Sequence, residues 1–107
     1  KEKVTFDAAY GGERMQAYVF LPKHAARPLQ VVFVWPGDSG LQLASSDTPG
    51  TLRIFDFIVK SGRAVLFPVF KGMYERRDGL EATVPNETAA YRDRVVAWVR
   101  EARRSVD

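Results

Sequence analysis

Cysteine is absent from these 107 residues, and histidine occurs only once, at His24. The chain therefore forms no disulfide and offers no thiolate to a metal, and its redox compartment stays open. A histidine-based zinc site or a complete Ser-His-Asp triad would have to be built around His24. The chain also lacks the glycine-rich motifs G-x-x-x-x-G-K-[ST] and G-x-G-x-x-G. We therefore expect no metal and no cofactor.

Long apolar runs and a strong charge of one sign are also missing. The longest apolar stretch, Ala64–Phe70, contains Pro68, and it is far shorter than the roughly 20 residues of a membrane-spanning helix. Sixteen Lys and Arg oppose 13 Asp and Glu, giving a net charge of +3. The basic residues are spread among acidic ones rather than clustered with aromatics, which argues against nucleic-acid binding. The sequence leaves the compartment open, with the cytoplasm favoured.

An apolar content of 46% indicates a folded chain rather than a disordered one. Residues 4–21 predict a β-hairpin, because apolar and polar side chains alternate on both sides of Tyr10–Glu13, which contains two glycines. The alternation implies that one face of the hairpin is buried and the other is wet.

The middle of the chain predicts a β-α-β unit over residues 29–70. Residues 29–35 form a nearly continuous apolar run, typical of a strand covered on both faces in a parallel sheet. Residues 51–61 have the spacing of a well-buried helix, and residues 64–70 predict a second buried strand. Pro68 cannot donate to a sheet ladder, so we expect it at the end or the edge of that strand.

Residues 87–106 predict the longest helix, beginning near Asn86-Glu87-Thr88. One face carries Tyr91, Val95, Trp98, Ala102 and Val106, and the other carries mainly charged residues that include Glu101. A parallel strand should follow this helix, but the sequence ends at Asp107. Because the chain also begins with lysine rather than methionine, we expect residues 1–107 to be one partial domain of a longer protein. Its exposed sheet should associate with a neighbour.

The loop Trp35-Pro36-Gly37-Asp38-Ser39-Gly40 is the strongest candidate for chemistry. It follows a predicted parallel strand, and open α/β sheets bind ligands at the carboxyl ends of their strands. Small residues there let backbone N–H groups point into a cleft and stabilise an oxyanion. The simpler interpretation is a loop that merely reverses the chain.

Several segments, taken in order, resemble the α/β-hydrolase superfamily. Val31–Gly37 resembles the strand and His-Gly-type oxyanion loop of these enzymes, with Pro36-Gly37 in place of His-Gly. Phe55–Pro68 resembles the next helix and strand of the prolyl-oligopeptidase and dienelactone-hydrolase branch, and Lys71–Arg76 resembles the loop that follows. Tyr91–Asp107 resembles the helix before the nucleophile strand. In their order along the chain, these segments also resemble the hydrolase module fused to some bacterial serine/threonine protein kinases.

The resemblance implies an α/β fold in which a hairpin precedes a β-α-β-α unit of a mostly parallel sheet. It further implies a serine hydrolase that cleaves ester or peptide bonds through an acyl-enzyme. The nucleophile of this family lies in G-x-S-x-G, a motif that this sequence lacks, so nucleophile, acid and histidine are expected after Asp107. The present residues would supply the oxyanion loop, through the backbone of Gly37, Asp38 and Ser39. The implied partners are the substrate and the remainder of the domain.

Two other functions stay open. The first is a non-catalytic α/β-hydrolase-like interaction or regulatory module, in one form attached to a protein kinase. The second is an SGNH (GDSL-type) esterase with Ser39 as the nucleophile, although the Asp-x-x-His block of those enzymes is missing. The same Gly-Asp-Ser-Gly tetrapeptide also occurs in trypsin-like proteases, but their all-β fold does not fit this pattern.

Six residues have both a functional and a plain structural interpretation. Trp35 and Tyr74 are candidates for substrate binding, or are ordinary packed aromatics. Asp38 is a candidate acid or base, or the cap of its own loop. Arg76-Arg77 would suit an anionic substrate group, or are solvated. His24 lies before the predicted strand, far from the cleft, and is interpreted as a solvated linker residue.

Overall fold

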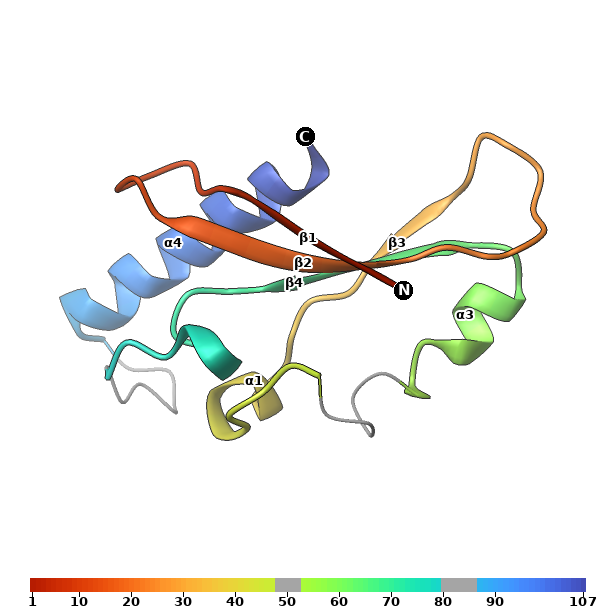
Figure 1. Cartoon of the computed structure of the whole chain (residues 1–107). Coiled ribbons are helices and arrows are strands. Elements are labelled where there is room, and N and C mark those ends of the chain that lie inside the picture. Colours follow the sequence, from red (N-terminus) through yellow and green to blue (C-terminus); the bar gives the residue numbers. More distant parts are fainter. Residues whose placement is uncertain (48–52, 80–86) are drawn as a thin grey trace.

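The computed structural model describes residues 1–47, 53–79 and 87–107, and it has mixed α/β content (Figure 1). The strands are β1 (Glu2–Asp7), β2 (Arg14–Phe20), β3 (Val31–Phe33) and β4 (Ala64–Val69). The helices are α1 (Ser39–Gln42), α3 (Asp56–Lys60) and α4 (Ala89–Val106), with a 3₁₀ turn η1 (Tyr74–Arg76). The predicted α/β class is therefore confirmed.

The strands form one mixed sheet in the order β1-β2-β4-β3. The predicted hairpin corresponds to β1 and β2, and its turn is closed by the N–H of Ala8, which donates to Glu13 O over 2.8 Å. Gly11 and Gly12 have φ values of +62° and +63°, a region that glycine adopts without steric cost. Among the described strands, β3 and β4 are the one parallel pair, whereas β2 pairs antiparallel with both β1 and β4. The expectation of a mostly parallel sheet is wrong for this part of the chain.

The central strand β4 is buried or half-buried along its whole length, as predicted. Ala64 N donates to Gln30 O and Leu66 O accepts from Val34 N, each over 2.9 Å, so alternate residues of β4 direct their backbone groups toward β3. Pro68 is the next residue in that series, but pairing with β3 stops at Leu66. The missing N–H of Pro68 thus interrupts no ladder, which confirms its expected place near the strand end.

The strand expected over residues 29–35 is shorter and more exposed than predicted. β3 has three residues, lies at the edge of the sheet and pairs only with β4. Its first residue, Val31, is 61% exposed, and the other two are half-buried. A continuous apolar run indicated burial on both faces, but an edge strand leaves one side of its backbone open.

The helix expected over residues 51–61 also differs from the prediction. Its first two residues lie outside the described part, and α3 covers only Asp56–Lys60. Phe55, just before α3, is buried, whereas Ile54 and Phe57 are exposed. The expected widening of the buried face by Ile54 and Phe57 is therefore wrong. Phe55, together with the half-buried Ile58 and Val59, packs this segment against the core.

Helix α4 lies along one side of the sheet, with α1 and α3 on the other side (Figure 1). It begins near the predicted residues, and the Thr88 side chain caps it by accepting from Tyr91 N over 3.2 Å. Trp98 is buried as expected, but two assignments are wrong. Val106 is exposed, and Glu101 lies in the core with 0% of its surface exposed.

Candidate functional site

The loop after β3 opens into a pocket of about 330 Å³ at the carboxyl end of that strand. Four residues proposed from the sequence, Trp35, Gly37, Ser39 and Tyr74, lie around this one pocket. The remaining lining residues are Val34, Pro36, Ile54, Phe55 and Phe67. Asp38 is exposed and is not among the described lining residues.

The first carbonyl groups of this loop accept hydrogen bonds within the turn itself, whereas its first amides are unused. Gly40 N donates to Gly37 O over 2.9 Å, and Leu41 N donates to Asp38 O over 3.0 Å. The N–H groups of Gly37, Asp38 and Ser39 have no acceptor within the described parts of the chain. Unused amides beside a mainly apolar pocket are suited to an anionic oxygen.

The loop after β4 packs directly against this turn. A Cβ atom on Gly40 would lie 2.9 Å from Met73 Sδ and 3.1 Å from Tyr74 Cε2. Tyr74 is 1% exposed, its ring centroid lies 6.1 Å from that of Phe67, and its φ of +50° is in the left-handed region. A non-glycine residue there costs on the order of 1–3 kcal/mol, which the surrounding packing must offset.

Trp35 forms a half-open aromatic wall beside the pocket. Its ring centroid lies 4.7 Å from that of Phe70 and 6.3 Å from that of Phe33. One side of the indole therefore packs on the core, while the other side remains exposed. Such a side chain offers an apolar surface to a substrate group without having to be displaced from the core.

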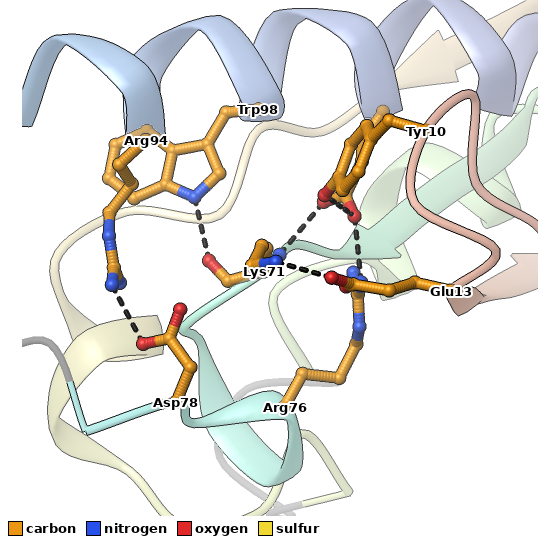
Figure 2. Close-up of polar contacts among 8 residues, drawn as sticks. Tyr10, Glu13, Lys71, Arg76, Asp78, Arg94 and Trp98 are labelled. Carbon is orange, nitrogen blue, oxygen red and sulfur yellow. Dashed lines mark hydrogen bonds and ion pairs between the residues drawn. The ribbon is translucent and has the colours of Figure 1, made fainter. Parts of the chain in front are cut away.

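Helix α4 holds the loop after β4 through a buried carboxylate that sequence reasoning missed. Glu101 accepts from Tyr10 OH (2.6 Å), Arg76 Nη2 (2.7 Å) and Lys71 N (2.8 Å) (Figure 2). Glu13 pairs with Lys71 at the edge of the same group. These five residues, the Glu101 cluster, join the β1–β2 turn, the loop after β4 and α4.

The Glu101 cluster changes the acidity of two of its members. Burial, and then the hydrogen bond to Glu101, raise the pKa of the Tyr10 hydroxyl above its usual range. Burial alone would lower the pKa of Arg76, but the hydrogen bond and the charge of Glu101 outweigh it and raise that pKa. Both shifts favour the same arrangement, in which a neutral Tyr10 hydroxyl and a cationic Arg76 donate to the Glu101 carboxylate.

A second contact between α4 and the same loop depends on a glycine. Arg94 Nη2 donates to Asp78 Oδ1 over 2.7 Å, and Trp98 Nε1 donates to Lys71 O over 2.8 Å (Figure 2). Gly72 has a φ of +78°, and a Cβ on it would lie 1.8 Å from Arg94 Nη1. Only glycine lets the guanidinium pack this closely against the backbone.

A third buried polar group ties the chain before residue 48 to the 3₁₀ turn. Ser46 is fully buried; its N–H donates to Glu75 Oε2 (2.9 Å) and its hydroxyl to Glu75 Oε1 (2.7 Å). Gln16 donates to the same carboxylate. Burial alone would raise the pKa of Glu75, but the hydrogen bonds from Ser46 and Gln16 lower it overall.

Other sequence candidates lie away from the loop pocket. His24 lines a separate pocket with Gln30 and Arg63, at the opposite end of β3 from Ser39. A Ser39–His24 pair is therefore not formed. Arg76 belongs to the Glu101 cluster, and the exposed Arg77 donates to the backbone carbonyls of residues 41 and 42, so both guanidinium groups already have protein partners.

Within residues 1–47, 53–79 and 87–107, no three His, Cys, Asp or Glu side chains are grouped to hold a metal ion. None of the described helices is long and apolar enough to span a bilayer. Compared with known proteins, the chain matches no protein-family model, no curated protein and no solved structure.

Proposed function

We propose that this chain is the N-terminal half of an α/β-hydrolase domain, and that its Pro36–Gly40 loop stabilises the oxyanion formed during ester or peptide hydrolysis. One observation carries the proposal. Gly37 and Ser39, whose amides are unused, line one pocket at the carboxyl end of β3 together with Trp35 and Tyr74.

The chemistry needs a nucleophile from outside these residues. Attack of a serine hydroxyl on the substrate carbonyl places negative charge on the carbonyl oxygen, and the collapse of this intermediate leaves an acyl-enzyme. Loop N–H groups that donate to the charged oxygen lower the barrier, and the loss of one such donor costs roughly 10²–10³ in rate. Trp35 would pack against the apolar part of the acyl group.

The topology supports a nucleophile strand next to the loop. Crossovers between parallel strands are almost always right-handed. The helix α3 between β3 and β4 and the helix α4 after β4 lie on opposite faces of the sheet (Figure 1). The crossover through α3 runs along the sheet from β3 to β4. A right-handed crossover through α4, on the opposite face, would run the other way, from β4 back past β3. A parallel strand that followed α4 would therefore pair with the open edge of β3, beside the pocket.

A non-catalytic interaction module of the same fold is the second candidate. The exposed apolar side chains of Val31, Ile54 and Phe57 favour it, because a docking surface would cover them. The two candidates differ in one respect: only the enzyme needs a reactive serine.

Proline scanning of the loop tests the proposal in the native polypeptide that carries these residues. Asp38 has a φ of −57°, which proline accommodates, so Asp38→Pro removes an amide donor while Asp38→Ala keeps it. Ser39→Pro and Ser39→Ala form the second pair. Turnover of a p-nitrophenyl ester should fall by about 10²–10³ in a proline variant and stay near wild type in its alanine partner.

Three results would count against the proposal. The first is a native polypeptide that neither turns over esters nor reacts with a fluorophosphonate, which favours the interaction module. The second is equal activity in the proline and alanine variants. The third is loss of activity in Ser39→Ala, which assigns the nucleophile to Ser39.

A further inference from the structure

Helix α4 carries a second apolar stripe on its solvent side. Val96, Val99 and Val106 are 43%, 46% and 67% exposed. Together with Arg92 and Arg103, which are also exposed, they follow one another at intervals of four, three, four and three residues. This is the spacing at which one helix presents a seam to another helix.

Uncompensated positive charge lies along this stripe. The side chains of Arg100 and Arg103 are exposed, and in the part of the chain that the structure describes neither has an ion-pair or hydrogen-bond partner. Other arginines of α4 are paired: Arg92 with Asp93 at 2.7 Å and Arg104 with Asp107 at 3.5 Å. The stripe therefore combines exposed valines with two guanidinium groups that lack a counter-charge.

A recess adjoins the stripe along one flank of the helix. Its volume is about 480 Å³; Ala90 and Ala97 line it from α4, and Tyr10 lines it from the β1–β2 turn. Val96 and Arg100 belong both to the stripe and to the lining of the recess. A large side chain on a partner would fit beside the two alanines.

We propose that this stripe of α4, Arg92, Val96, Val99, Arg100, Arg103 and Val106, is a docking surface for an acidic amphipathic helix of a partner protein. Apolar side chains of the partner would cover Val96 and Val99, and its carboxylates would pair with Arg100 and Arg103. A second copy of α4 is a poorer occupant. Pairing two copies would bring together the guanidinium groups of Arg100 and Arg103 from both, with no additional carboxylates to neutralise them. The surface lies on the other side of the sheet from α1 (Figure 1).

A synthetic three-heptad peptide with leucine at a and d and glutamate at e and g is the probe. Added to the full chain, the labelled peptide should bind with a fluorescence anisotropy change that weakens as salt rises. Arg100→Glu/Arg103→Glu and, separately, Val99→Ser should each weaken binding by about tenfold or more. Circular dichroism of each variant confirms that it is folded.

Matched controls separate the stripe from general charge and hydrophobicity. Lys23→Glu/Arg53→Glu changes the net charge by the same amount at exposed positions elsewhere. Val31→Ser removes another exposed valine. Both control variants should bind the peptide as the wild type does.

Three outcomes would overturn the proposal. They are equal binding by the stripe variants and their controls, equal binding of a scrambled peptide of the same composition, and no binding at all. If the chain does not bind the peptide but forms a concentration-dependent dimer, and Val99→Ser abolishes that dimer, the stripe is assigned to a second copy instead.

Discussion

Gly40 packs against the ring of Tyr74, so closely that a Cβ on the glycine would lie 3.1 Å from Cε2 of the tyrosine. This contact joins the candidate oxyanion loop to the loop after β4. The second loop is in turn held by α4 through the Glu101 cluster and through Arg94. The geometry of the pocket therefore depends on a helix that does not line it.

Gly40→Ala should destabilise the fold by about 1–3 kcal/mol, because the new methyl group overpacks against Met73 and Tyr74. Urea unfolding measures the change. Gly37→Ala is the matched control: its Cβ meets nothing within 4 Å, so we expect a change within about 0.5 kcal/mol. Equal effects at the two glycines would show that the contact with Tyr74 is unimportant.

Gly72→Ala should cost more than an ordinary left-handed glycine substitution. Its Cβ would collide with Arg94, whereas Gly79, with a similar φ of +75°, has nothing within 4 Å. Gly79→Ala should therefore cost only about 1 kcal/mol, from the backbone alone. In an Arg94→Ala background, the excess cost of Gly72→Ala over Gly79→Ala should shrink. An unchanged excess would rule out the clash as its cause.

Glu101→Gln should destabilise the fold by about 3 kcal/mol, because the largely buried Arg76 guanidinium loses its 2.7 Å ion pair and keeps only the longer one, 3.6 Å, to Glu13. The exposed pair of Arg92 and Asp93 offers the comparison: Asp93→Asn should change the free energy of unfolding by less than about 1 kcal/mol. Denaturant titrations at constant pH give both values. A small effect of Glu101→Gln would mean that the buried charge contributes little to stability.

Acid should weaken the link between Ser46 and Glu75. The folded-state pKa of Glu75 lies below the usual 4.5, so its contribution is complete above that pH and disappears as the pH falls through the folded-state value. The urea midpoint should therefore decline with falling pH more steeply in wild type than in Glu75→Gln. Parallel curves for the two proteins would contradict the assignment.

Much of the fold could be predicted because local patterns agree with it. Alternation indicated the hairpin, apolar content indicated the central β4, and spacing around Trp98 indicated α4. The position of β3 could not be read in the same way, because a continuous apolar run does not distinguish a central strand from an edge strand that awaits a neighbour. Strand order depends on long-range pairing rather than on the run itself.

Residues singled out in the sequence lie around one pocket, whereas the buried polar groups that support its loops were not predicted. Trp35, Gly37, Ser39 and Tyr74 share one pocket, as expected from loops at neighbouring strand ends. Glu101 was placed on the solvent face because it is charged, although it lies three residues after Trp98 on the same side of the helix. Its charge favoured exposure, and its burial becomes favourable through donors that are distant in sequence: Tyr10, Lys71 N and Arg76.

The hydrogen bond from Tyr10 to Glu101 spans 91 positions of the chain. During synthesis the hairpin leaves the ribosome before α4 does. The hydroxyl of Tyr10 therefore has no Glu101 carboxylate to donate to until α4 has been synthesised. Until the residues of α4 have been synthesised, the surface of the hairpin around Tyr10 is uncovered, and uncovered surface of this kind is what chaperones bind.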